Sequence, residues 1–150
     1  MATTLLEAKA ETNTAPRSTT PPVSNVIQFP SGLLGFEQLK KFALVGRTQE
    51  APFLWMDGPE DSRISFIVVP PRQLVPDYQP DLADEDVKFL GLKSPNDALV
   101  LTIVTISGPR RATINLKGPL VINARTRIGK QVVPVNADDY SSEYLLPVSK

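Results

Sequence analysis

The sequence predicts an all-β protein, mainly antiparallel, folded as a small barrel-like domain with one short helix. Three observations indicate this class. Apolar residues recur with a period of two in several short segments. Fifteen prolines punctuate the 150 residues, which suits a chain with many turns better than a helical one. Pro, Gly and Asp gather at the ends of the apolar segments, where turns are expected.

The strands follow from these patterns in chain order. The segment 99–106 (LVLTIVTI) is apolar on both parities, so we expect it to be buried on both faces. Many short strands of this kind are typical of a barrel or barrel-like sandwich, which closes its edges. Strands are expected at 26–29, 42–46, 53–56, 64–69, 99–106, 112–117, 120–123 and 130–135.

One helix is expected near residues 84–90. Asp84, Glu85 and Asp86 would occupy its first turn, where carboxylates meet free backbone amides and the positive end of the helix dipole. Gly91 follows as a natural C-cap.

The first 24 residues differ in composition from the rest. They are rich in Thr, Ala, Pro and Ser, show no period and end near Pro21 and Pro22. We expect residues 1–24 to be a disordered tail, and residues 25–150 to form one domain. No apolar run approaches the ~20 residues of a membrane span, and no signal-peptide core is evident, so a cytoplasmic protein is expected.

The chain contains no Cys and no His. This excludes disulfides, thiol nucleophiles, imidazole bases and zinc sites of the Cys/His kind. No paired carboxylates are placed together by the sequence. We therefore expect no enzyme, no cofactor and no metal site.

Charge is balanced over the chain but not along it. Sixteen basic residues match sixteen acidic ones. The segment 110–130 holds six basic residues and no acidic one, whereas nine acidic and two basic residues lie between positions 50 and 86. One of these two regions is therefore the better candidate for meeting a partner.

The basic segment supports several interpretations. In 112–117 (ATINLK) the alternation predicts that Thr113, Asn115 and Lys117 share a solvent-exposed strand face with Arg111. Direct RNA binding is disfavoured, because the segment has no stacking aromatic residue and the domain is neutral. Contact with a partner protein, or pairing with the chain's own acidic segment, stays open. The residues 125–130 (RTRIGK) lack phosphate-loop spacing and predict a turn between two strands.

An entry motif and six later sequence blocks carry a resemblance. The segment from Ile27 to Glu37 (IQFPSGLLGFE) resembles the entry motif of the FliW family of flagellar assembly factors. The blocks PFLWMD, FIVVPP, PDYQPDLADEDVKFLGL, LTIVT, INLKGPLVIN and TRIGKQVV match later family blocks in the same order. The chain departs from the family at Leu34, where Pro is usual, and at Asp57 and Gly58. The tail is an addition, and the match after Val135 is loose.

The resemblance implies a function. Members of this family are small β-barrel proteins of flagellated bacteria. The resemblance implies that the chain binds the RNA-binding translational repressor CsrA, lifts its repression of flagellin mRNA, and also binds flagellin. It implies no catalysis, no cofactor, no direct nucleic-acid contact and no membrane.

An acidic cluster is the candidate surface for CsrA. A repressor that binds RNA presents basic residues, so an opposite charge steers encounter and repels RNA once docked. The competing interpretation gives these residues structural work at the helix start and, for Asp77, in a turn. The candidates are Asp77, Tyr78, Asp81, Asp84, Glu85 and Asp86.

Apolar residues in and near loops are the candidates for flagellin. A groove for an apolar helix would need such residues exposed. The competing interpretation makes them core residues that close one end of the barrel. The candidates are Leu33, Leu34, Phe36, Phe53 and Trp55.

Two other classes of function stay open. A small barrel can hold a flavin or another ligand in its mouth, which flavin absorbance of the purified protein would show. A barrel of the oligonucleotide-binding kind would bind RNA directly, with steep salt dependence.

Overall fold

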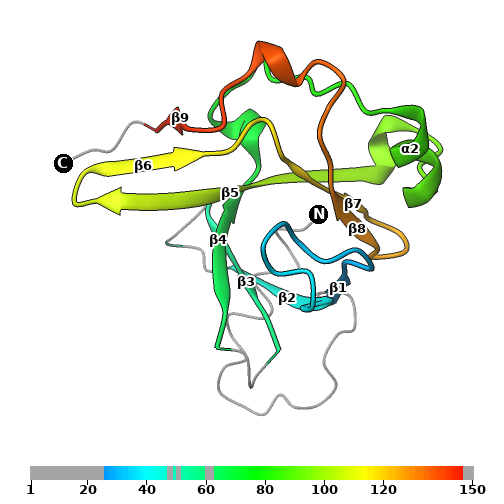
Figure 1. Cartoon of the computed structure of the whole chain (residues 1–150), viewed down its shortest axis with the longest axis horizontal. Helices are drawn as coiled ribbons and strands as arrows, with labels where there is room; N and C mark the ends of the chain where they lie inside the picture. The colour runs from blue at the N-terminus through cyan, green and yellow to red at the C-terminus, as the bar shows by residue number, and fades with distance from the viewer. Residues whose placement is uncertain (1–25, 47–48, 50–51, 60–62, 147–150) are drawn as a thin grey trace.

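The computed structural model describes residues 26–46, 49, 52–59 and 63–146, so the expected tail at 1–24 lies outside the described residues. The predicted all-β fold is confirmed (Figure 1). Every strand pair is antiparallel. The strands are β1 (Val26–Gln28), β2 (Lys41–Gly46), β3 (Leu54–Asp57), β4 (Ser65–Val69), β5 (Ala98–Gly108), β6 (Arg111–Ile114), β7 (Leu120–Asn123), β8 (Gly129–Gln131) and β9 (Tyr144–Leu145).

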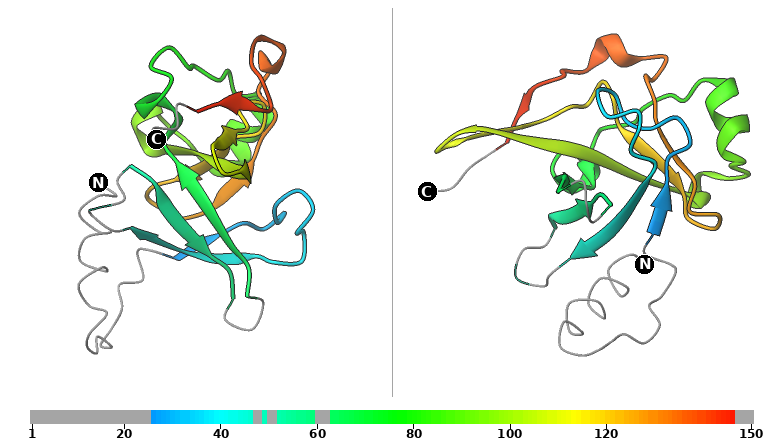
Figure 2. Two further views of the ribbon diagram at one scale, coloured as in Figure 1. Left: turned by 90° about the vertical axis from the view of Figure 1, so that its left-hand side faces the viewer. Right: turned by 60° about the horizontal axis from the view of Figure 1, so that its bottom comes forward.

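The predicted helix is α2 (Asp84–Leu90), and it ends at Gly91 in the left-handed conformation. Three short 3-10 turns were not anticipated by the sequence: η5 (Pro71–Gln73), η6 (Pro95–Asp97) and η7 (Ala137–Asp139). The helix and the tip of the β5–β6 hairpin lie at opposite ends of the molecule, as Figure 2 shows.

The sheet runs in the order β1-β2-β3-β4-β5-β6-β9, with β7 paired to β5 and β8 paired to β7. It curls into a roughly barrel-like shape but does not close. Among the described residues, β1 meets the chain before β8 through one parallel bridge between Gln28 and Ile128. The Gln28 amide donates to the Arg127 carbonyl at 2.9 Å.

The main core fills this open barrel. It contains Phe29, Phe42, Met56 and Leu101, all buried. The rings of Phe29 and Phe42 meet edge to face, with centroids 5.8 Å apart, an arrangement that aromatic quadrupoles favour. A Cβ built on Gly129 would lie 2.9 Å from Phe29 Cε2, so glycine at this position lets the ring pack against β8.

β5 carries two cores on its two faces. Leu99, Leu101 and Ile103 face the main core, while Val100 and Val104 pack into a second core. The prediction that 99–106 is buried on both faces is right as far as Val104. It is wrong for the last residues, because the β5–β6 hairpin projects from the body and leaves Ile106 exposed (Figure 1).

The second core is covered by the segment after β4 and by the C-terminal segment. Tyr78 is buried there with Ile114, Leu116 and Leu146. The Tyr78 hydroxyl donates to the Leu116 carbonyl at 2.7 Å. This bond lies inside the protein and holds the loop that precedes α2 against the sheet.

A third, smaller core lies under α2. Leu90 packs on Val121 of β7 and on Val132. Asn123 donates from Nδ2 to the Leu90 carbonyl at 2.8 Å, which satisfies an acceptor at the helix end. Lys130 Nζ lies 2.5 Å from Asp86 Oδ1 and so ties β8 to the helix.

The predicted solvent-exposed face of 112–117 is wrong in part. β6 ends at Ile114, and Thr113 is buried where it pairs with Leu145 of β9. Asn115 and Lys117 lie in a turn and are half-buried. The sequence pattern did not reveal β9, the short edge strand that pairs with β6 at Thr113 and Ile114.

Replacing Asp86 by Ala should lower the free energy of unfolding by about 1.5–3 kcal/mol, because it removes a charge-assisted bond and leaves the Lys130 ammonium half-buried without it. Urea unfolding of the full chain measures this. The matched control is Asp84→Ala, an exposed carboxylate in the same helical turn, which should cost less than about 1 kcal/mol. Equal losses for the two variants would contradict the role given to the Asp86–Lys130 pair.

Replacing Gly129 by Ala should destabilise the protein by about 1–3 kcal/mol, because the added methyl overlaps Phe29 and Ile122 in a packed core. Thermal unfolding followed by circular dichroism measures this. In Gly108→Ala the nearest atom to the new Cβ is Arg111 Cβ at 3.9 Å, so this control should stay within about 0.5 kcal/mol. If the Gly129→Ala variant is as stable as its control, β8 can shift to accommodate the methyl group without loss of stability, and the prediction is wrong.

Candidate functional site

The structure gathers acidic side chains from two segments that are far apart in the sequence. The loop before α2 lies against the C-terminal segment around η7, so that Asp138 and Asp139 join the predicted acidic cluster. We call the following exposed carboxylates the acidic surface: Asp77, Asp81, Asp84, Glu85, Asp138 and Asp139.

Hydrogen bonds fix the two segments together. The Asp81 amide donates to Asn136 Oδ1 at 2.8 Å, and Asn136 Nδ2 donates to the Gln79 carbonyl at 3.1 Å. The Val135 amide donates to the Asp81 carbonyl at 2.7 Å. Asn136 therefore binds both a donor and an acceptor of the neighbouring loop, and its side chain sets the position of the carboxylates around it.

Two members of the predicted CsrA cluster are not at the surface. Tyr78, the one aromatic candidate, is fully buried, and its ring meets that of Tyr140 edge to face with centroids 4.7 Å apart. Burial, and to a lesser degree the nearby Tyr140, raises the pKa of the Tyr78 hydroxyl. Asp86 is buried as well and pairs with Lys130. Both residues position the surface and do not form part of it.

Asp84 and Glu85 lie in the first turn of α2 and are exposed. The N-cap residue, Ala83, makes no side-chain capping bond. The carboxylates of this turn therefore compensate the helix dipole without a capping side chain. Since they are exposed, this structural role leaves them accessible to a partner.

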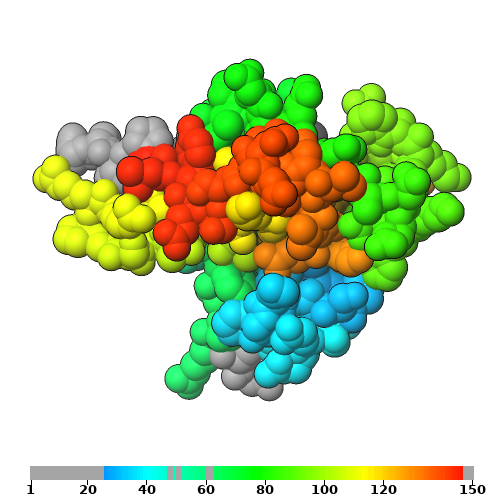
Figure 3. Space-filling model, turned by 45° about the horizontal axis from the view of Figure 1, so that its top comes forward, coloured from blue at the N-terminus to red at the C-terminus, as the bar shows by residue number. Residues whose placement is uncertain are grey.

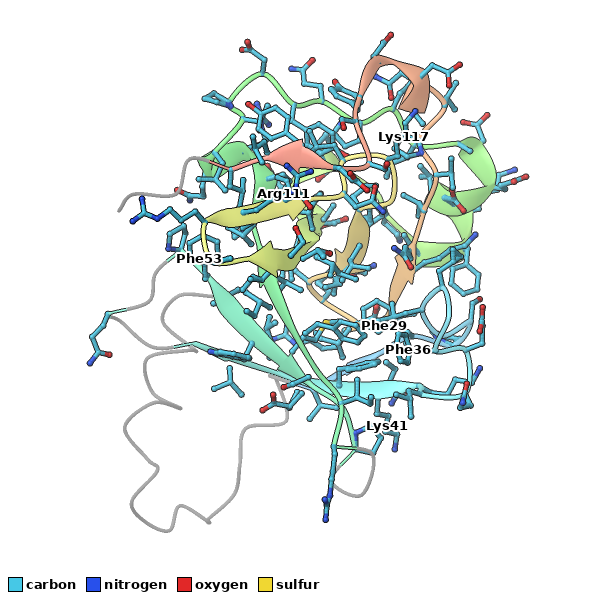
Figure 4. The ribbon with its side chains drawn as sticks, turned by 60° about the vertical axis from the view of Figure 1, so that its left-hand side comes forward. Phe29, Phe36, Lys41, Phe53, Arg111 and Lys117 are labelled. Carbon is cyan, nitrogen blue, oxygen red and sulfur yellow. The ribbon has the colours of Figure 1, made fainter. Side chains whose placement is uncertain are left out.

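The five apolar candidates do not form one surface. Leu33 is buried in the main core, while Phe36 is half-buried and its ring meets that of Phe66 edge to face at 5.3 Å. Phe53 packs against the second core, apart from Phe29 and Phe36 (Figure 4). Trp55 is half-buried in β3. Only Leu34 of the five is exposed.

The loop that carries Leu34 has a defined shape. Gly32 adopts φ 71°, and a Cβ there would lie 2.5 Å from the Glu37 backbone, so no other residue fits. The Leu34 amide donates to Gln131 Oε1 at 3.0 Å. This bond holds the exposed leucine beside the end of β8.

The basic segment 110–130 is engaged largely within the chain. Lys117 Nζ donates to the Ala137 carbonyl at 3.3 Å. The predicted turn after β7 is confirmed, since Asn123 Oδ1 accepts from the amides of Arg125 and Thr126. Among the described residues, the ion pairs of the segment are Arg111–Glu143 at 3.7 Å, Arg125–Asp97 at 3.6 Å and Lys130–Asp86.

These pairs answer the question that the charge pattern raised. The carboxylates that they use lie in the turn before β9, in η6 and in α2, so these three basic residues face different parts of the fold. The Lys93 amide, chiefly, and Arg125 to a lesser extent hold the pKa of Asp97 below its usual value. Pairing with the chain's own acidic residues therefore accounts for half of the segment's six basic side chains.

The described residues bring no three His, Cys, Asp or Glu side chains together in a way that could hold a metal ion. No helix in the described part of the chain is long and apolar enough to cross a membrane.

Comparison with known proteins gives one family. Residues 11–146 match the model of the FliW protein family. The chain is 37% identical over 123 residues to the flagellar assembly factor FliW of Leptospira interrogans, covering 81% of this chain and 82% of that protein. It is 39% identical to the FliW of Thermotoga neapolitana, with 81% and 82% covered.

A solved structure agrees. A crystal structure of the flagellar assembly factor FliW superposes with a TM-score of 0.73 at 27% sequence identity, and the match covers 84% of this chain and 88% of that chain. Together with the motif blocks and the open, barrel-like antiparallel sheet, these matches confirm the resemblance. The chain belongs to the FliW family of flagellar assembly factors.

Proposed function

We propose that this flagellar assembly factor acts by binding CsrA, the RNA-binding translational repressor, and by relieving its repression of flagellin mRNA. The proposal includes a second partner, flagellin itself. It assigns the chain a regulatory role by protein contact, with no catalysis and no cofactor. Since CsrA acts on mRNA and flagellin is met before its export, the proposal places the protein in the cytoplasm.

The acidic surface is the observation that supports CsrA binding. Its six carboxylates are exposed and belong to two segments joined by the hydrogen bonds of Asn136. An RNA-binding protein presents cations where phosphates lie. A surface of opposite sign accelerates encounter with such a protein and, once docked, raises the electrostatic cost of bringing RNA to the same place.

The site we propose for CsrA is therefore the acidic surface, with Tyr78 and Asp86 holding it from beneath. For flagellin, Leu34 offers the exposed apolar side chain, and Phe36, Phe53 and Trp55 offer part of theirs. Leu33 supports the loop from the core.

If the protein works by displacing a repressor, it should release labelled flagellin mRNA leader from CsrA in a dose-dependent way and should not bind that RNA itself at physiological salt. Gel-shift titrations with and without CsrA measure the two effects. Tight, salt-sensitive RNA binding by the protein alone would favour a direct RNA-binding barrel. Release without any contact between the two proteins would contradict the proposal.

Replacing Asp81, Asp138 and Asp139 together by Asn should slow association with CsrA several-fold at low salt and change dissociation less. The deficit should shrink as salt shortens the screening length toward ~8 Å and below. Stopped-flow or biosensor kinetics measure both rates, after a melting curve confirms that the variant folds.

The matched control replaces Arg110 and Arg111 by Gln at the tip of the β5–β6 hairpin. This variant should associate with CsrA as the unmodified chain does. Loss of binding in the arginine variant, with binding kept in the aspartate variant, would place the contact on the basic hairpin.

A further inference from the structure

The three most exposed large apolar side chains of the described residues are Leu34, Val133 and Val135, at 73%, 72% and 68% exposure. Val133 and Val135 lie in the segment that continues from β8, where the residue before them, Val132, and the residue between them, Pro134, are buried. This alternation is that of an extended chain, so the two valines point to the same side. Figure 3 looks onto this face, with the segment in orange above the loop of Leu34 in blue.

Leu34 belongs to the same surface. Gln131 has the same parity as Val133 and Val135, and its Oε1 accepts from the Leu34 amide at 3.0 Å. Leu34 therefore lies next to Gln131, at the end of the line formed by Gln131, Val133 and Val135. We call Leu34, Val133 and Val135 the apolar stripe.

A partner of the apolar stripe would meet side chains and not a free strand edge. The Val132 amide donates to the Pro119 carbonyl at 3.0 Å, and the Val135 amide donates to the Asp81 carbonyl at 2.7 Å. In an extended chain, amides three residues apart point to opposite edges. Both edges of this segment are thus already hydrogen-bonded, which disfavours the addition of a strand.

The length of the apolar stripe fits a helix. From Gln131 to Val135 an extended chain advances about 13 Å. A helix rises about 1.5 Å per residue, so the same length corresponds to roughly nine residues and to apolar side chains near positions i, i+4 and i+8.

Charge gives the helix a direction. At its Val135 end the apolar stripe meets Asp81, whose carbonyl binds the Val135 amide, and the chain continues through Asn136 to Asp138 and Asp139. A helix lying on the apolar stripe would therefore bring its next turn over carboxylates. Basic residues at that end would be attracted, and acidic ones repelled.

We propose that the apolar stripe, together with Asp81, Asp138 and Asp139, is a docking site for an amphipathic helix of a partner protein whose apolar ridge leads into basic residues. This goes beyond the proposed function, because it assigns a binding mode and a ligand chemistry to Val133 and Val135. The docking site shares Asp81, Asp138 and Asp139 with the surface proposed for CsrA, and Leu34 with the residues proposed for flagellin.

The test uses a synthetic helical peptide of about 18 residues with leucines at i, i+4 and i+8 followed by lysines. Its fluorescent form is titrated with the full chain, and amide shifts of the labelled chain are recorded by NMR. Saturable binding is expected, with shifts gathered at residues 34 and 131–139. Val133→Ser combined with Val135→Ser should weaken binding at least about fivefold, because buried apolar contact is lost.

Two controls make the outcome decisive. Ile106→Ser removes an exposed apolar side chain (62%) on the β5–β6 hairpin and should leave binding unchanged. A peptide with Glu in place of the lysines should bind more weakly, most clearly at low salt. The proposal is overturned if neither peptide saturates, if the double serine variant binds like the unmodified chain, or if the Glu peptide binds equally well. Since CsrA and flagellin are absent from the assay, such a result leaves the proposed function to be judged separately.

Discussion

β5 has to satisfy two hydrophobic cores at once, and the rest of the structure depends on this constraint. Leu99, Leu101 and Ile103 complete the main core, and Val100 and Val104 complete the second core. The one polar residue between them, Thr102, is buried, and its hydroxyl donates to the Val69 carbonyl at 3.0 Å, so this buried donor is paired. A strand covered on one face only would leave the loops of the second core without a support.

The second core explains how exposed carboxylates are held in place. The loop before α2 has no regular structure of its own between η5 and the helix, yet Tyr78 anchors it through an apolar contact and a hydroxyl bond to Leu116. Asn136 then joins it to the C-terminal segment. Contacts of buried groups thus offset the entropy lost when this loop is ordered. The exposed carboxylates are not needed to hold the loop in place, apart from those that stabilise the start of α2.

The sequence predicted the helix and every described strand except β9, because period-two alternation and a carboxylate-rich first turn are local signals. It failed where a distant segment decides the outcome. Thr113 was expected to be exposed, but β9 pairs beside it in the sheet; Tyr78 was expected at a partner surface, but it is buried and its hydroxyl donates to the Leu116 carbonyl. Asp86 was expected to be a surface carboxylate, but it is buried and pairs with Lys130 of β8. Asp138 and Asp139 were missed because nothing near them in the sequence links them to Asp81.

The single bridge between Gln28 and Ile128 bears on how the chain comes to be folded. β1 to β4 are joined by antiparallel pairs of near neighbours and can form while the chain is still being synthesised. The bridge between Gln28 and Ile128, by contrast, joins the first strand to a residue close to the end of the domain. β5, which contributes to both cores, also lies late in the sequence. Until translation has passed β8, the apolar side chains of the early strands have no complete core, and the nascent chain needs protection from aggregation during that interval.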